Sequence, residues 1–330
     1  TELAFAGDVS SAERSIELPR QMLEDIAGGV TPKLRDLIAS FEEAADGIPR
    51  GESPIHRQFA QRELHPLTLI SPWMHRCYTK PFGYAGDYVM LNMVLDDPFQ
   101  GPNTYAKVLN NSLVTTNPPI AYANRITMLV ERLRAENQRV RQDFGRPLRA
   151  ITVGCGPVNE VQRFLRDDAL SRGCNFDLMD FNDPTIRFAQ SRVEAVTAET
   201  GRDLQVQFVN KSIHELLQEA RGKRESTSRR YDLVYCAGLF DYLSDRICGA
   251  LIELFFSWLN PGGLVVVTNV ANSDPIVNVV EYLMEWYLIY RDQDHMLRLA
   301  PHLGSQSVAV DATGINMFLD VRKDAEQTDG

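Results

Sequence analysis

A strand that stops at glycines and continues as a helix is the feature that most constrains this chain. Residues 150–153 predict a short buried strand, Gly154, Cys155 and Gly156 a tight turn, and residues 158–165 an amphipathic helix. Glycines let the backbone pass close to a ligand, and the first turn of a helix offers unpaired N–H groups at the positive end of its dipole. The stretch therefore indicates a nucleotide-binding turn, with an ordinary Gly-x-Gly turn as the alternative.

Four further strands follow this turn, each separated from the next by a helical segment. They are predicted at residues 176–182, 204–209, 231–236 and 264–268. Asp180, in the first of them, stands where doubly wound sheets hydrogen-bond a ribose. The alternation of strands and helices predicts an α/β sheet with a ligand crevice at the ends of its strands.

The order of these motifs resembles that of class I S-adenosylmethionine-dependent methyltransferases. The motifs that carry the resemblance are Gly154-x-Gly156, Asp180, Asp232-Leu-Val and Asn260-Pro-Gly-Gly. Two strands predicted at residues 307–310 and 315–321 are similar to the antiparallel hairpin that closes that fold. The resemblance covers about residues 146–325 and implies a Rossmann-like sheet with S-adenosyl-L-methionine as the cofactor.

The chain departs from that family at two positions of the glycine turn. The family usually has an acidic residue where this chain has Thr152, and a third glycine where it has Val158. Without the acid, a backbone carbonyl or a residue from the N-terminal half is left to hold the methionine ammonium. These departures keep open a donor-binding module without catalysis. A NAD-binding Rossmann domain fits less well, because its third glycine would fall on Asn159 and the closing hairpin would have no role.

The resemblance also implies which residues surround the donor. Asp180 would bind the ribose hydroxyls and Phe181 would stack on the adenine. Leu239, Phe240 and Tyr242 would lie near the transferring methyl group, with the first two in the substrate site. The cofactor-binding candidates are Gly154, Cys155, Gly156, Asp180, Phe181, Asn210, Lys211, Ser212, Ile213, Cys236, Ala237 and Gly238.

The first half of the chain predicts a separate helical unit. We place an N-terminal helical cap or lid domain at residues 1–145 and the S-adenosylmethionine-binding domain at residues 146–330. The apolar spacing and the positions of proline predict helices at residues 11–26, 31–46, 53–64, 105–111 and 118–144.

Residues 65–88 have little helical or strand periodicity and crowd aromatic and ionisable side chains together. We interpret them as a lid loop, with Tyr84, Asp87 and Tyr88 facing the site and Tyr78 beside the substrate. The alternative is a surface loop whose aromatic residues pack beneath it. Asp87 is also placed to cap the helix that follows it.

A helix predicted at residues 276–291 is dense in polar aromatic residues. Tyr282, Trp286 and Tyr290 are spaced four apart and would share one stripe of that helix. Such a stripe predicts either core packing or the far wall of the acceptor pocket, since buried tyrosine and tryptophan need polar partners.

A narrower resemblance concerns the acceptor. Residues 80–88 and 282–291 resemble segments of bacterial methyltransferases of 3-hydroxypalmitate methyl ester biosynthesis. This implies a small-molecule substrate, a carboxylate or hydroxy acid of fatty-acid-like character, with a small amine or thioether as the alternative. A carboxylate acceptor needs no general base, whereas a hydroxyl does, and His65, His75 and His295 are the candidates for one. The candidates for catalysis are Tyr84, Asp87, Tyr88, Tyr242 and His295.

Charge and composition exclude several partners. A formal net charge of −10 argues against nucleic acid, which requires a concentrated basic surface. The five cysteines have no C-x-x-C spacing and indicate neither a disulfide framework nor a metal site. No apolar run approaches the length of a membrane span and no signal-peptide pattern is seen, so we expect a cytoplasmic protein. The apolar faces of the N-terminal helices are explained equally by a homodimer and by packing within one chain.

Overall fold

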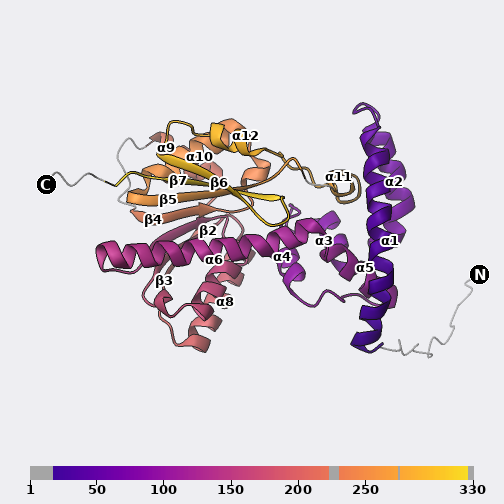
Figure 1. Ribbon diagram of the computed structural model, residues 1–330, viewed down its shortest axis with the longest axis horizontal. Coiled ribbons are helices and arrows are strands. Elements are labelled where there is room, and N and C mark those ends of the chain that lie inside the picture. The colour runs from indigo at the N-terminus through magenta and orange to yellow at the C-terminus, as the bar shows by residue number, and fades with distance from the viewer. Residues whose placement is uncertain (1–17, 223–229, 274–275, 326–330) are drawn as a thin grey trace, which may run out of the picture.

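The computed structural model describes residues 18–222, 230–273 and 276–325. Its centre is a mixed sheet in the strand order β3-β2-β1-β4-β5-β7-β6 (Figure 1). The strands are β1 (Arg149–Val153), β2 (Asn175–Asp180), β3 (Gln205–Asn210), β4 (Tyr231–Cys236), β5 (Leu259–Val270), β6 (Ser305–Val310) and β7 (Asn316–Arg322).

The sheet confirms the predicted fold class. Strands β1 to β5 pair in parallel, and β7 pairs antiparallel with both β5 and β6, which makes the closing hairpin. The chain runs from β1 outward to β3 and then returns to β4 on the other side of β1. In open α/β sheets a ligand crevice forms at this reversal, outside the carboxyl ends of the strands.

Helices cover both faces of the sheet, as Figure 1 shows. Apolar residues of α6 and α7 pack with β1 and β2 in one core, whereas α10 packs in a second core with β4 and β5. The helices around the sheet are α6 (Asn117–Phe144), α7 (Asn159–Asp167), α8 (Asp183–Thr200), α9 (Ile213–Gly222), α10 (Asp245–Ser257) and α12 (Gln293–Arg298), with single 3₁₀ turns η1 (Ala169–Ser171) and η2 (Phe240–Tyr242).

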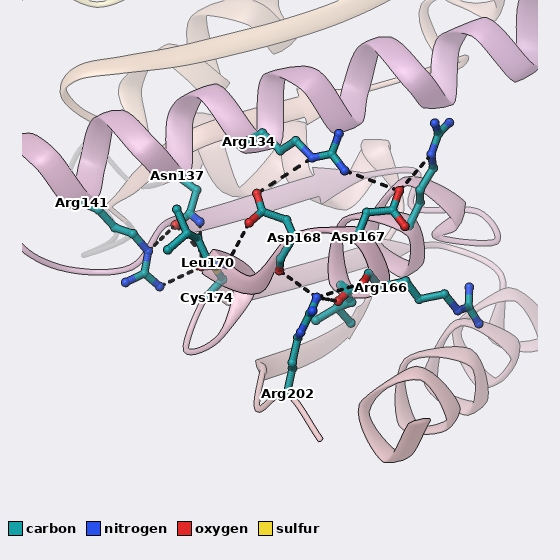
Figure 2. Close-up of polar contacts among 11 residues, drawn as sticks. Arg134, Asn137, Arg141, Arg166, Asp167, Asp168, Leu170, Cys174 and Arg202 are labelled. Carbon is teal, nitrogen blue, oxygen red and sulfur yellow. Dashed lines mark hydrogen bonds and ion pairs between the residues drawn. The ribbon is translucent and has the colours of Figure 1, made fainter. Parts of the chain in front are cut away.

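Polar contacts fix α6 against the segment between α7 and β2 (Figure 2). The buried side chain of Asn137 donates to the carbonyl of Leu170 at 2.8 Å and accepts from the backbone N–H of Leu148 at 3.2 Å. Arg134 pairs with Asp167 across 3.4 Å at the exposed end of the same contact. A buried amide with both functions satisfied holds position better than an exposed ion pair, so Asn137 sets where α6 lies relative to β1.

A second helical unit lies beside the sheet and includes one C-terminal helix. Residues of α11 share a core with α1 to α5, and Figure 1 shows α11 next to α1 and α2. The helices are α1 (Arg20–Asp46), α2 (Ser53–Thr68), α3 (Pro72–Thr79), α4 (Tyr88–Leu95), α5 (Thr104–Val114) and α11 (Val277–Met284).

The N-terminal helices differ from their predicted bounds at prolines. The helices predicted at residues 11–26 and 31–46 are one helix from Arg20, which passes through Pro32, and residues 11–17 lie outside the described residues. Proline clashes with the carbonyl four residues before it, here on Gly28, where the absence of a side chain leaves room for adjustment. Likewise α2 continues through Pro66 to Thr68. The predicted helices at 105–111 and 118–144 are confirmed as α5 and α6.

The interpretation of residues 65–88 as one irregular loop is wrong, because eight of them form α3. Ser71 caps this helix through its hydroxyl, which accepts from the N–H of Met74 at 3.3 Å, and Pro72 suits the first helical turn. Only residues 80–87 connect α3 to α4. The predicted cap is confirmed, since Asp87 accepts from the N–H groups of Val89 and Met90 at 2.9 Å.

The single helix predicted at residues 276–291 is also wrong. Helix α11 ends at Met284, and Glu285 takes a left-handed conformation with φ 48°. Side chains of the N-terminal unit bind the carbonyls at this end: Gln61 donates to Tyr282 at 2.8 Å and Lys80 to Glu285 at 2.8 Å. Trp286 and Tyr290 therefore lie beyond the helix, and no helical stripe joins them to Tyr282.

Two predictions about the whole chain are not decided by this arrangement. The domain division at residues 145/146 stays a prediction, and α6, which lies before it, packs in the core of the sheet. The homodimer stays a prediction as well. Among the residues with described coordinates, no helix is both long and apolar enough to cross a membrane.

Candidate functional site

A cavity of about 460 Å³ opens at the carboxyl ends of β1, β2 and β4, between the sheet and the N-terminal helical unit. Such a volume is in the range of small-molecule sites. Its wall combines loops of the sheet with residues of α4, α6 and α11, so both halves of the chain contribute to it.

The glycine turn forms the floor of this cavity. Gly154 and Gly156 have φ values of +73° and +54°, and the N–H groups of Gly154 and Cys155 both donate to the carbonyl of Met179 at 2.9 Å. A Cβ on Gly154 would meet no atom within 4 Å, and one on Gly156 would only approach Leu91 at 3.9 Å. The turn thus needs glycine for its backbone conformation, and its open side leaves room for a ligand.

Val158 occupies the position of the family's usual third glycine and keeps the conformation of one. Its φ is +50°, in the left-handed region, and its side chain is fully buried. A β-branched residue with positive φ is strained, so the surrounding packing holds it there.

Asp180 reaches the cavity from the end of β2. Its two carboxylate oxygens accept from the backbone N–H groups of Gly156 at 3.2 Å and Asn182 at 3.0 Å. Burial raises the pKa of Asp180 despite these hydrogen bonds. A carboxylate fixed in this way, with a cavity in front of it, can accept hydrogen bonds from the hydroxyls of a ribose.

Aromatic rings flank the cavity next to Asp180. The rings of Phe181 and Tyr84 lie 5.6 Å apart, and the ring of Tyr88 stacks on Phe188 at 4.5 Å. Burial raises the pKa of Tyr84 to about 12, so its hydroxyl keeps its proton near neutral pH. Phe181, Tyr84 and Tyr88 all line the cavity, and their rings are suited to lie beside a flat base.

The other predicted donor residues divide into two groups. Lys211, Ile213, Ala237 and Gly238 line the cavity. The remaining four are not part of the cavity wall. Cys155 and Cys236 are buried, the amide of Asn210 donates to Asp183, and the hydroxyl of Ser212 donates to Glu215 at 2.7 Å.

Two of the predicted catalytic residues lie outside the cavity wall. Asp87 is fully buried, where it caps α4 and accepts from Arg76 at 2.8 Å. His295 lies on α12 and contacts Asp245 at 2.7 Å. These contacts give both residues structural roles. Tyr242 does line the cavity, and its hydroxyl accepts from the indole N–H of Trp286 at 2.8 Å.

The predicted substrate residues are scattered. Leu239 and Trp286 line the cavity. Phe240 is buried in the core of the sheet, and Tyr290 is not part of the cavity wall. The two remaining tyrosines pack in the helical unit, Tyr78 on the ring of His65 and Tyr282 on the ring of Phe41.

Several wall residues were missed by reasoning from the sequence. Most are apolar and sit on amphipathic helices, where they read as ordinary core. Arg125 and Asp241 are charged, but no motif marked them. The missed residues include Trp73, Met90, Leu91, Val94, Pro118, Pro119, Tyr122, Arg125, Asp241, Ile276, Val280, Met284, Leu288 and Ile315. In the part of the chain that the structure describes, no group of three or more His, Cys, Asp or Glu side chains is placed to hold a metal ion.

Comparison with solved structures finds matches at low sequence identity. A possible exported protein from Bordetella parapertussis is 15% identical, with coverage of 94% of this chain and 100% of that chain and a TM-score of 0.53. Magnesium protoporphyrin IX methyltransferase from Synechocystis PCC 6803 is 12% identical, with coverage of 62% and 80% and a TM-score of 0.42. The N-methyltransferase NodS from Bradyrhizobium japonicum WM9 is 16% identical, with coverage of 72% and 97% and a TM-score of 0.41.

Comparison of the sequence with protein families is more decisive. A search of curated proteins found no match. A family model described as a methyltransferase domain matches residues 123–316, which is more than half of the chain. The chain therefore belongs to the methyltransferase-domain family, whose members use S-adenosylmethionine as the methyl donor.

Proposed function

We propose that this methyltransferase transfers the methyl group to the carboxylate of a small acceptor with an apolar body. The observation that carries the proposal is that one cavity is lined by two kinds of residue, which we assign to a donor part and an acceptor part. Glycine backbone and Asp180 line one part, and apolar side chains of the helical unit line the other. Donor and acceptor can then meet where the two parts join.

The donor part is suited to an adenosyl group. The ribose would lie at Asp180, the adenine beside Phe181 and Ile213, and the sulfur-bearing end over Gly154. S-adenosylmethionine supplies a methyl group already activated on a sulfonium. The protein's contribution is then to align the two reactants and to exclude water from them.

The acceptor part favours a hydrophobic molecule. It is built from α3, α4, the start of α6 and the segment from Ile276 to Leu288. Its members are Trp73, Met90, Leu91, Val94, Pro118, Pro119, Ile276, Val280, Met284 and Leu288. Burying apolar area in such a site contributes about 25 cal/mol per Å². A fatty-acyl chain matches this lining better than a strongly polar acceptor does.

The lack of a histidine in the described cavity wall favours a carboxylate as the methylated group. No histidine is among the described residues of the cavity wall. His65 is engaged with the carbonyl of Leu283 at 3.0 Å, and His295 is engaged with Asp245. A carboxylate attacks without prior deprotonation, whereas a hydroxyl or an ammonium would need a base. The narrower sequence resemblance, to enzymes making 3-hydroxypalmitate methyl ester, supports the same class of acceptor.

A direct assay tests this proposal. The purified protein would be incubated with S-adenosylmethionine labelled in its methyl group and with 3-hydroxy fatty acids of increasing chain length, and the products would be identified by mass. Methyl esters, formed faster as the chain lengthens until the cavity is filled, are expected. The matched controls are the same acids as amides and fatty amines of equal length. Methylation of the amine or of the hydroxyl in place of the carboxylate would overturn the assignment.

A further inference from the structure

Two opposite charges line the cavity on the side of β4, and the adenosyl group leaves both unexplained. They belong to Arg125, on α6, and Asp241, in the turn η2 after β4. The sequence offers no acid at Thr152 for the donor's ammonium, so the site needs another partner for it.

The strand order locates this pair along the cavity. Strands β2, β1 and β4 are neighbours in that order. The ribose and adenine positions lie at the end of β2, and the glycine turn follows β1, so a donor lying across the strand ends points its methionine end toward β4. Asp241 lies in the loop that follows β4. Gly238 belongs to the same loop, and the guanidinium of Arg125 lies against it.

Arg125 is held in place without a salt bridge among the described residues. Its guanidinium lies over the ring of Tyr122, with Cζ 5.0 Å from the ring centre. Within the described residues it makes no hydrogen bond or ion pair. A Cβ on Gly238 would come within 2.7 Å of its Nη1, so only glycine leaves it this position. A guanidinium with its donors free, in a cavity wall, is suited to bind a carboxylate in a bidentate manner.

Asp241 is a fixed, buried carboxylate. Its exposed fraction is 4%, and its Oδ1 accepts from the backbone N–H of Val270 at 2.6 Å. The hydrogen bonds of the described residues do not use its Oδ2. Its turn is anchored by Arg291, which donates to the carbonyl of Phe240 at 3.0 Å. A buried carboxylate in a cavity wall, with one oxygen that accepts no hydrogen bond from the described residues, is suited to bind a cation.

Two other nearby polar residues do not line the cavity. Thr152 is buried and is not part of the cavity wall. Glu160 accepts from Tyr235 at 2.9 Å and is not part of the cavity wall. Neither can replace Asp241 as a partner for a ligand's ammonium.

We propose that Arg125 binds the carboxylate and Asp241 the ammonium of the donor's methionine end. Asp241 thereby replaces the acid that the family usually carries at the position of Thr152. The inference rests on the proposed function only in that S-adenosylmethionine is the donor, and it holds for any acceptor.

The test is calorimetric titration of the purified protein and its variants with three adenosyl ligands. S-adenosylhomocysteine carries both charged groups, its decarboxylated analogue carries only the ammonium, and 5′-methylthioadenosine carries neither. Arg125→Gln should weaken S-adenosylhomocysteine by about tenfold or more and leave the other two unchanged. Asp241→Asn should weaken the first two ligands and leave 5′-methylthioadenosine unchanged.

Controls separate this effect from misfolding and from an acceptor role. Arg134→Gln and Asp167→Asn remove the same charges from an exposed ion pair elsewhere (Figure 2) and should bind all three ligands like the wild type. Unchanged 5′-methylthioadenosine binding shows that a variant is folded.

If Arg125→Gln binds S-adenosylhomocysteine normally and instead raises the KM for the acceptor, the guanidinium binds the acceptor's carboxylate and the inference is overturned. A wild type that binds 5′-methylthioadenosine but not S-adenosylhomocysteine would also overturn the inference. A wild type that binds none of the three adenosyl ligands would instead contradict the proposed function.

Discussion

Trp286 donates a hydrogen bond from its indole Nε1 to the hydroxyl of Tyr242 across 2.8 Å, which joins the segment after α11 to the turn after β4. Both side chains line the cavity, and Gly86 lies so close that a Cβ on it would be 3.3 Å from the Tyr242 hydroxyl. Three segments distant in sequence therefore meet at one point of the cavity wall.

The first prediction concerns this contact. Trp286→Phe keeps an aromatic ring but removes the donor, which frees the Tyr242 hydroxyl from its fixed orientation. A neutral hydrogen bond contributes about 1 kcal/mol, so we expect kcat/KM for the acceptor to fall about fivefold. Steady-state kinetics and donor titration measure the two effects separately, and donor affinity should not change.

A matched control is available at the next residue. Tyr287 is 50% exposed and its hydroxyl accepts from Arg57 outside the cavity. Tyr287→Phe also removes one polar group from an aromatic residue and should leave kcat/KM unchanged. Equal losses in the two variants would show that the effect comes from the general stability of this segment.

The second prediction concerns Asp180 as the ribose partner. If it accepts hydrogen bonds from both ribose hydroxyls, Asp180→Ala should weaken donor binding by about 2 to 4 kcal/mol. Calorimetric titration with S-adenosylhomocysteine measures this, and an unchanged affinity would refute the assignment.

Its pH dependence follows from the direction of the shift. Burial raises the pKa of Asp180 above its ordinary value of 3.8. A carboxylate accepts hydrogen bonds best when it is ionised. As the pH falls, Asp180 therefore takes up its proton at a higher pH than an exposed aspartate does. Donor affinity should decline as the pH falls through this raised pKa, and Asp180→Asn should lack the decline.

The contrast between the sheet and the helical unit shows what local sequence can specify. The strands and the glycine turn follow from patterns within a few residues, and Asp180 follows from its distance to that turn. The end of α11 does not, because Gln61 and Lys80, more than two hundred positions earlier, bind its last carbonyls. Residues 285–291 read as a continued helix for this reason.

The apolar part of the cavity wall could not be predicted from the sequence for a related reason. Leu91, Val94 and Val280 look like core residues on their own helices, and only the convergence of α4, α6 and α11 leaves a space between them. Arg125 likewise reads as one of many surface arginines of a long helix. Its position in the cavity wall depends on Gly238, which follows a strand far along the chain.

The third prediction concerns the ion pair between the buried Asp232 and the partly exposed Arg146, which ties the segment after α6 to the sheet. Asp232, in β4, accepts from Arg146 at 2.7 Å, from the N–H of Arg149 at 2.9 Å and from Asn260 at 2.8 Å. Burial alone would raise the pKa of Asp232, but these hydrogen bonds outweigh it and hold the pKa below 3.8. Asp232→Ala leaves the N–H of Arg149 and the amide of Asn260 without this acceptor and should cost about 1 to 3 kcal/mol of the free energy of unfolding.

The sign of the pH effect is fixed by the same shift. Because the pKa of Asp232 is lowered in the folded state, the unfolded state binds more protons at pH values between the folded and the unfolded pKa. The stability that Asp232 contributes is therefore complete above pH 3.8, the ordinary pKa of an aspartate, and is lost as the pH falls through the lower pKa of the folded state. Denaturant unfolding of wild type and Asp232→Asn should therefore converge at acidic pH. A difference that stays constant with pH would contradict the role of the charge.

The last prediction concerns Val158, whose left-handed backbone replaces a glycine. Val158→Ala loses buried methyl groups but keeps the strain of a Cβ at positive φ. Val158→Gly loses slightly more of the side chain but removes this backbone strain, which costs about 1 to 3 kcal/mol. We therefore expect the glycine variant to be at least as stable as the alanine variant in denaturant unfolding. Val161, also fully buried and three residues further along α7, supplies the control, because there glycine should be less stable than alanine by about 1 kcal/mol. If glycine is the less stable substitution at both positions, the backbone of Val158 is not strained and the turn does not require the conformation of a glycine at this point.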